Sequence, residues 1–147
     1  MKFEIKRPKS RFGVGIELKD APAGAILTGN VFLDQGDIFE DVIDADTPFL
    51  VFEDGQGAVQ LIQRDLIRRV VSLKDERIGL LVADRHEERV IMVMGGEERS
   101  GVLMLTTYSR VSDHMNKGGM FTAFRPDGGR LEFVNKSAIE RVILEPR

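Results

Sequence analysis

Apolar residues alternate with small or polar residues in short runs along most of this chain. Residues 12–18 and 89–94 form two such runs, and each is followed by a small, polar turn and then by a glycine. Alternation of this kind over about four to eight residues is typical of β-strands that have one buried face. The pattern therefore predicts a protein built mainly of short strands.

The same series of runs occurs twice and predicts the same strands each time. The later strands of the two series are expected at 29–33 and 101–105, 49–52 and 121–124, 58–62 and 130–134, and 66–71 and 139–144. The segments 53–57 and 125–129 carry Gly and Asp, which favour the turns of hairpins. Each series is therefore expected to contain a hairpin between its third and fourth strands.

The remaining segments predict smaller elements. One helical turn is expected at 38–43 and another at 111–115, with Asp37 or Ser112 as the N-cap. Two further strands are expected at 2–6 and 78–82, each in a hairpin with its neighbour.

An internal duplication explains why the pattern repeats. A shift of 72 residues places 29–70 on 101–142 without a gap. The identical pairs include Gly29 with Gly101, Leu33 with Leu105, Asp41 with Asp113, Phe49 with Phe121, Phe52 with Phe124, Ile67 with Ile139 and Val70 with Val142. A fixed period of this length indicates a duplicated structural unit. We expect two repeats, 1–73 and 74–147, that pack on each other or on further chains, because a unit of this size is only marginally stable alone.

The second repeat resembles Sm-like proteins. Its end follows their second signature, which consists of an apolar residue, Lys, Ala-Ile and Val at fixed spacing, at Val134, Lys136, Ala138, Ile139 and Val142. Gly101 and the segment 113–116 resemble the first signature, in which a strand glycine precedes Asp, Met and Asn. The resemblance implies an all-β protein of two tandem small Sm-like or SH3-like barrels, with at most short helical turns. It also implies RNA binding as one candidate function.

The chain departs from the Sm pattern at positions that concern RNA. Asp113 follows Gly101 by twelve positions, about twice the spacing of the Sm family. Asn135 and Ser137 stand where the bacterial Sm-like RNA chaperone carries an aromatic residue and a histidine that contact RNA. The expected fold depends less on these positions than the expected RNA binding does.

A second resemblance is closer. The block is similar to a bacterial domain family that carries a Ser-Asp-x-Leu-Asn segment before a Phe-rich hairpin and has no known activity. Ser112, Asp113, Met115 and Asn116 fit that segment, with Met in place of Leu. This resemblance implies a bacterial protein and supports the fold without indicating a chemistry.

Charge weighs against nucleic acid and suggests protein contacts. The formal net charge of the chain is -3, whereas nucleic-acid binders carry clustered positive charge. The first repeat has an acidic run at Asp34, Asp37, Glu40, Asp41, Asp44 and Asp46. The equivalent part of the second repeat carries Arg110, Asp113 and Lys117 instead. The two repeats could therefore meet head to tail, within a chain or between chains. The alternative interpretation is that these charges lie on solvated loops.

The sequence offers no recognisable catalytic or metal site. It has no cysteine, and His86 and His114 lack the spacing of metal ligands. We therefore expect no enzyme, no cofactor and no metal. No apolar run reaches the roughly 18 residues that span a bilayer, and the first residues do not resemble a signal peptide, so a cytoplasmic protein is expected.

These observations favour a non-enzymatic binding or assembly module that contacts a protein partner or further copies of itself as a homo-oligomer. The alternative function is RNA binding through Asn116 and the loop at 135–136. The candidate binding residues are Asp41, Asp44, Arg64, Asp113, Asn116, Asn135 and Lys136. Structural interpretations stay open for several of them. Asp41 and Asp113 would cap turns, Arg64 and Lys136 would lie in exposed turns, and the phenylalanines at positions 49, 52, 121 and 124 would form the core.

Overall fold

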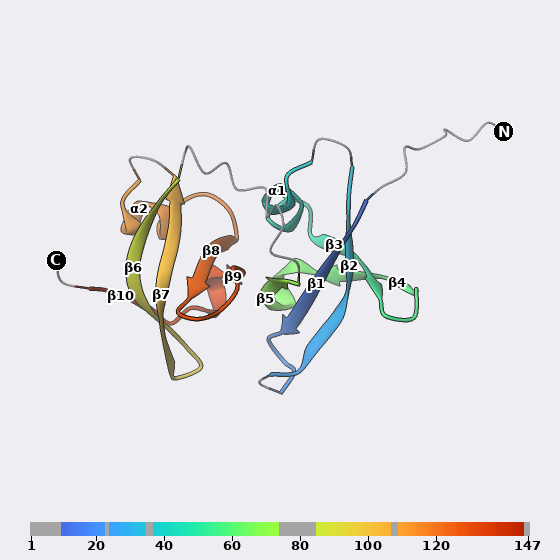
Figure 1. Ribbon diagram of the computed structural model, residues 1–147, viewed down its shortest axis with the longest axis horizontal. Coiled ribbons are helices and arrows are strands. Elements are labelled where there is room, and N and C mark those ends of the chain that lie inside the picture. The colour runs from blue at the N-terminus through green and yellow to red at the C-terminus, as the bar shows by residue number, and fades with distance from the viewer. Residues whose placement is uncertain (1–9, 23, 35–36, 74–84, 107–108, 146–147) are drawn as a thin grey trace.

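The computed structural model in Figure 1 describes residues 10–22, 24–34, 37–73, 85–106 and 109–145. The first half contains β1 (Ser10–Leu18), β2 (Ile26–Leu33), α1 (Phe39–Ile43), β3 (Phe49–Asp54), β4 (Val59–Gln63), the 3₁₀ turn η1 (Arg64–Leu66) and β5 (Ile67–Ser72). The second half contains β6 (Arg85–Met94), β7 (Glu97–Thr106), α2 (Val111–Asn116), β8 (Phe121–Pro126), β9 (Glu132–Asn135), the 3₁₀ turn η3 (Lys136–Ala138) and β10 (Arg141–Leu144). The strands expected at 2–6 and 78–82 lie outside the described residues.

All of these strands belong to one antiparallel sheet. Its order is β10-β6-β7-β8-β9-β5-β1-β2-β3-β4, so each half contributes a block in which its last strand comes first, followed by its first to fourth strands. The all-β prediction is confirmed. The strand pairing describes one open sheet of ten strands, and the division into two small barrels stays a prediction.

The glycine of the second strand lets two strands approach closely in both halves. Gly29 pairs with Asp54 and Gly101 pairs with Pro126, which are equivalent registers under the 72-residue shift. A Cβ atom on Gly29 would lie 2.1 Å from the carbonyl oxygen of Glu53, and one on Gly101 would lie 2.4 Å from that of Arg125. Only glycine fits so near a neighbouring backbone.

The two helices lie where the sequence predicts them, but the expected caps are wrong. Their N-caps are Ile38 and Arg110, and neither cap makes a side-chain hydrogen bond. Asp37 lies one position too early and instead accepts a hydrogen bond from the backbone N–H of Asp34 at 2.7 Å. Ser112 lies inside α2. Each carboxylate or hydroxyl is thus displaced from the place where it could cap the helix.

The halves do not have separate cores. One cluster of buried residues combines Phe39, Ile43 and the inward residues of β1 to β5 with Phe121, Ala123, Leu131 and Phe133 of the second half. The other cluster lies within the second half and includes the buried Met92 and Met94. The first half therefore needs the second to complete its core.

Candidate functional site

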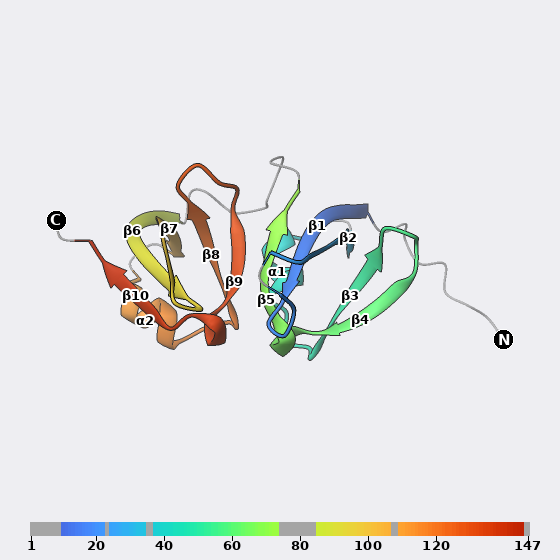
Figure 2. The same cartoon turned by 90° about the horizontal axis from the view of Figure 1, so that it is seen from below.

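The two halves meet where β5 pairs with β9, a contact that we call the junction (Figures 1 and 2). Val70 stands opposite Phe133, with Arg69 opposite Val134 on one side and Val71 opposite Glu132 on the other. The Phe133 ring meets Phe39 of α1 edge to face, with 5.3 Å between the ring centroids. The outer face of β8 and β9 therefore packs against the first half as a core surface does.

Two of the candidate binding residues hold the junction together. The Asn135 side chain is buried, donates a hydrogen bond to the carbonyl oxygen of Ile67 at 2.9 Å and accepts one from the backbone N–H of Ser137. Asp44, just after α1, accepts a hydrogen bond from the backbone N–H of Phe121 at 3.0 Å. Burial raises the pKa of Asp44, although the neighbouring N–H groups oppose the shift. Both residues are occupied by contacts between the halves.

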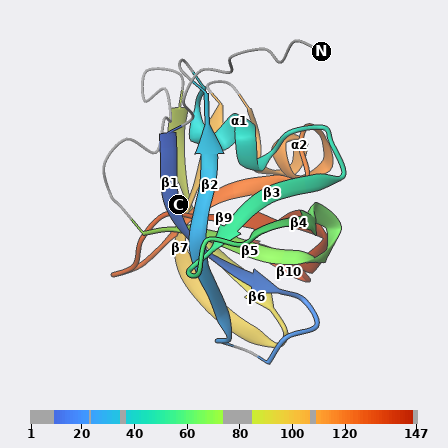
Figure 3. The same ribbon diagram turned by 90° about the vertical axis from the view of Figure 1, so that its right-hand side faces the viewer.

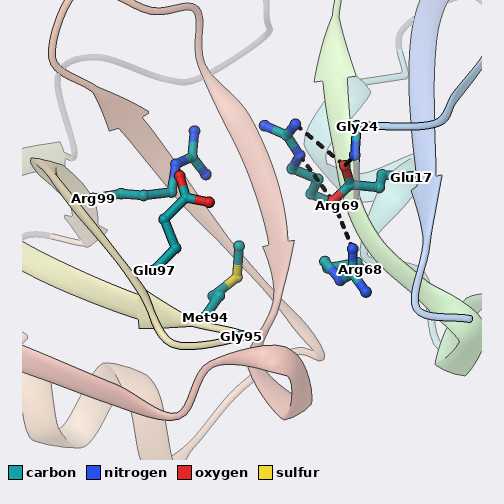
Figure 4. Close-up of a pocket in the computed structure, with 8 residues that line it drawn as sticks. All are labelled: Glu17, Gly24, Arg68, Arg69, Met94, Gly95, Glu97 and Arg99. Carbon is teal, nitrogen blue, oxygen red and sulfur yellow. Dashed lines mark hydrogen bonds and ion pairs between the residues drawn. The ribbon is translucent and has the colours of Figure 1, made fainter. Parts of the chain in front are cut away.

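A charged cluster lies beside the junction. Arg69 of β5 donates to both Glu17 of β1 and Glu132 of β9, and Arg99 of β7 also pairs with Glu132. In Figure 4, Arg99 lies across from Arg69 and Glu17. Burial alone would raise the pKa of Glu17, but Arg69, the N–H of Gly24 and Arg68 more than offset it, so this pKa lies below its ordinary value. Arg69 thus joins the two buried carboxylates, Glu17 of its own half and Glu132 of the other half.

Arg64 and Lys136 cap the helices of their own halves. The buried Arg64 guanidinium donates to the carbonyl oxygens of Val42, Ile43, Thr47 and Phe49. Lys136 donates to the carbonyl oxygens of His114 and Lys117 at 2.7 and 2.8 Å. The expected exposed turn is therefore wrong for Arg64, because the carbonyls at the end of α1 need a donor. Burial lowers the pKa of both cations.

The other candidate binding residues are exposed on the two helices and lie in different halves. Asp41 is on α1, and Asp113 and Asn116 are on α2. Asp113 pairs loosely with Lys117 at 3.9 Å. Asp41 and Asp113 lie inside helices, so they do not cap turns as expected. The structure thus distributes the seven predicted residues over the junction, two helix ends and two helix surfaces rather than gathering them in one site.

Among the described strands, β4 and β10 are the free edges of the sheet, and they lie at opposite ends of the molecule (Figures 1 and 2). Figure 3 looks onto the end formed by β3 and β4. Each free edge has an equivalent strand at the junction, since β4 corresponds to β9 and β10 corresponds to β5. The junction therefore uses one edge of each kind, and the molecule leaves the other two open.

Equivalent side chains differ sharply in exposure at these two places. Leu61 is 64% exposed whereas the equivalent Phe133 is 1% exposed. The same contrast holds for Val59 at 62% against Leu131 at 5%, Phe49 at 47% against Phe121 at 4%, and Val51 at 43% against Ala123 at 3%. The outer face of β3 and β4 is thus an apolar surface like the one buried at the junction. Contiguous exposed apolar surface of this kind marks an interaction site.

The opposite end of the molecule carries a groove. It is lined by Val111, Met115 and Asn116 of α2 and by Ile139 and Val142 next to and in β10, with Lys136 and Arg141 at its rim. Under the repeat shift, Val111 and Met115 correspond to Phe39 and Ile43, which pack in the core that receives Phe133. The groove is the counterpart of the surface that receives β8 and β9.

The sequence reasoning missed the apolar face of β3 and β4. Phe49 was expected in the core and is exposed, whereas Phe52, Phe121 and Phe124 are buried as expected. A signal was present, because β3 reads Phe-Leu-Val-Phe and β4 reads Val-Gln-Leu-Ile, with apolar residues on both faces. A strand that is apolar on both faces is typically covered on both.

Comparisons with protein-family models, curated proteins and solved structures gave no match to this chain. The resemblance to Sm-like proteins therefore stays a prediction from the sequence. In the described part of the chain, no group of three or more His, Asp or Glu side chains is placed to hold a metal ion. Neither α1 nor α2, nor any other helix among the described residues, is long and apolar enough to cross a membrane.

Proposed function

We propose that this protein is a non-enzymatic assembly module whose copies associate through the free edges β4 and β10. The observation that supports the proposal is the contrast between Leu61 and its counterpart Phe133, together with the three matching pairs around them. The chain buries one such surface within itself and exposes the other. Within this proposal each half is a small Sm-like or SH3-like barrel, and the cytoplasm of a bacterium is its setting.

Burial of the exposed face supplies the driving force for association. Covering a Val, Leu or Phe side chain contributes about 1.5 to 3 kcal/mol, and Phe49, Val51, Val59 and Leu61 lie on two paired strands. An uncovered edge strand also presents unpaired backbone groups, and proteins commonly blunt such edges with charge or proline. The polar residues of β4 are Gln60 and Gln63, and both are uncharged, so the edge lacks the charge or proline that would block pairing.

Replacing Leu61 by Lys tests the proposal. The wild-type chain should form particles several times its 16.5 kDa mass, and Leu61→Lys should shift them towards single chains, because a charged side chain cannot enter an apolar interface. Size-exclusion chromatography with light scattering measures the mass. Leu27→Lys is the matched control, since Leu27 is 42% exposed but lies on β2, away from both free edges.

A wild-type chain that stays at 16.5 kDa over a wide concentration range would contradict self-association. Equal masses of the wild type and Leu61→Lys would exclude β4 from it. The loss of large particles in Leu27→Lys as well would point to a general effect of surface charge.

RNA binding stays a prediction and gains no support from the described contacts. Lys136 donates to two backbone carbonyls of its own half, and the Asn135 side chain is buried at the junction. Neither group is presented as a free contact for a phosphate or a base. The assembly proposal agrees better with these contacts.

A further inference from the structure

We infer that β4 of one copy pairs with β10 of a second copy in the register that β9 and β5 use within the chain. This inference rests on the proposed self-association and adds its partner strand, direction and register. It places an interaction surface of one copy, the outer face of β3 and β4, in the groove beside α2 of the next.

The strand register follows from the repeat. Within the chain, Arg69 stands opposite Val134, Val70 opposite Phe133 and Val71 opposite Glu132. Adding 72 to the first partner and subtracting 72 from the second gives Arg141 opposite Ile62, Val142 opposite Leu61, and Ile143 opposite Gln60. The contact observed within the chain therefore gives the register of the inferred contact between two copies.

The apolar character of the side chains agrees with this placement. Leu61 would take the position of Phe133 and lie against Val111, which stands in the place of Phe39. In both cases smaller apolar side chains replace larger ones. The groove has room, because Val111, Met115, Ile139 and Val142 are only partly buried, whereas Phe39, Ile43, Ile67 and Val70 at the junction are fully buried. The second core cluster is therefore incomplete on the side where β4 would cover it.

Polar groups at the two surfaces are also complementary. Gln63 carries the same amide group as Asn135, whose Nδ2 donates to the carbonyl oxygen of Ile67, and Ile139 offers the equivalent carbonyl. The apolar residues Phe49 and Val51 share a hollow with three carboxylates, Asp34, Asp37 and Asp41, and with the buried Arg64, whose guanidinium donates to backbone carbonyls. The groove carries Lys136 and Arg141 alongside a single carboxylate, Glu140. Opposite charge at the rim favours the encounter of these two surfaces.

Pairing of unlike edges has a consequence for the assembly. Every copy that joins covers one β4 and one β10 and leaves one of each open, so the association is heterologous. Such a contact extends into a filament or closes into a ring, depending on the rotation from one copy to the next. Pairing of like edges, β4 with β4 or β10 with β10, would instead use the same surface on both copies. Each such contact would then join two copies and could not be extended by a third.

Disulfide trapping tests the pairing, because the chain has no cysteine. We would make Gln60→Cys and Ile143→Cys separately, since both side chains are exposed and stand opposite each other in the inferred register. Directly paired residues lie about 4.5 to 5.5 Å apart at Cα, within disulfide range. An equal mixture under mild oxidation should give a covalent dimer that contains one chain of each kind. Mass spectrometry should find the bond between residues 60 and 143.

The controls define the register and the direction. Gln56→Cys mixed with Ile143→Cys should cross-link at least ten times less, because Gln56 is exposed in the turn before β4 and lies about 13 Å along the chain from Gln60. Each variant alone should give no covalent dimer. A disulfide between two copies of Gln60→Cys, without Ile143→Cys present, would demonstrate pairing of like edges and overturn the inference.

Blocked edges provide a second measurement. Leu61→Lys keeps β10 open, and Val142→Lys keeps β4 open, because Val142 stands opposite Leu61 in the inferred register and lines the groove. Each alone should be a single chain, and their mixture should form a dimer that grows no further. Dimers of Leu61→Lys alone would overturn the inference. If the wild type assembles but the mixed Cys variants give no 60–143 disulfide, the pairing is overturned and the proposed function stands. A monomeric wild type would overturn both.

Discussion

At the scale of single residues, the buried polar side chains of this protein form hydrogen bonds with other groups of the same chain. Glu17 is buried and receives hydrogen bonds from Arg68, Arg69 and the N–H of Gly24. Arg64 donates to carbonyl oxygens at the end of α1. Buried polar groups of this kind are costly when a partner is removed, because the remaining group keeps its desolvation penalty. Their first role is therefore to fix local conformation.

Replacing Glu17 by Gln should lower the free energy of unfolding by about 1 to 3 kcal/mol at pH 7. The folded-state pKa of Glu17 lies below its ordinary value, so its ionised form stabilises the fold above pH of about 4.3. That contribution is lost as the pH falls through the lowered pKa. The difference between wild type and variant should therefore narrow from pH 7 towards pH 3.5, as measured by urea unfolding with far-ultraviolet circular dichroism.

The exposed Glu98→Gln is the control and should have little effect at either pH. A Glu17→Gln effect that stays constant with pH would show that the lost interaction does not depend on the charge.

At the scale of elements, one glycine in each second strand sets the close approach of the next strand. The nearest atoms to an added Cβ on Gly101 include the Arg125 carbonyl oxygen and the Phe124 ring, whereas one on Gly13 would meet Leu73 at an ordinary 3.7 Å. The repeat conserves this feature within the chain while the connections differ. Seven residues join β1 to β2, but only Gly95 and Gly96 join β6 to β7.

Gly101→Ala should therefore destabilise the protein by about 1 to 3 kcal/mol, because the backbone of β8 must move away. Gly13→Ala is the matched control and should change the stability by less than about 0.5 kcal/mol, since its new methyl group fits. Chemical denaturation of both variants measures the difference. Equal effects would show that the backbone approach at Gly101 is not tight.

At the scale of the whole molecule, the halves depend on each other because the first core includes side chains of the second. Phe133 belongs to β9 by sequence and to the core around Phe39 by packing. At the junction, Asp44 also accepts a hydrogen bond from the backbone N–H of Phe121, and Arg69 donates one to Glu132. Contacts of this number and burial couple the unfolding of the two halves.

Phe133→Ala should lower the free energy of unfolding by about 3 to 5 kcal/mol and reduce the hydrogen-exchange protection of β5 and β9 together. The measurement belongs in the Leu61→Lys background, so that association does not contribute. Leu144→Ala, at a residue that is 58% exposed, is the control and should leave both strands protected. Loss of protection in β9 alone would show that the halves unfold independently.

How far the sequence predicts this structure depends on the range of the interaction. Strand alternation, turn glycines and the repeat are local or periodic signals, and they predicted most strands and both helices within a few residues. The cap at Asp37 failed because a shift of one residue moves a side chain out of reach of the helix end. The prediction that Arg64 lies in an exposed turn failed because its carbonyl partners come from residues 15 to 22 positions away.

The sequence by itself determined an all-β chain in which one pattern of strands occurs twice, since alternation and self-similarity need no knowledge of the fold. Only the tertiary structure decided which of two equivalent surfaces is covered. Phe133 and Leu61 occupy the same place in their repeats, yet one is buried and the other exposed. The reason is that a chain of two repeats has one junction between unlike edges, so one edge of each kind must remain at its ends.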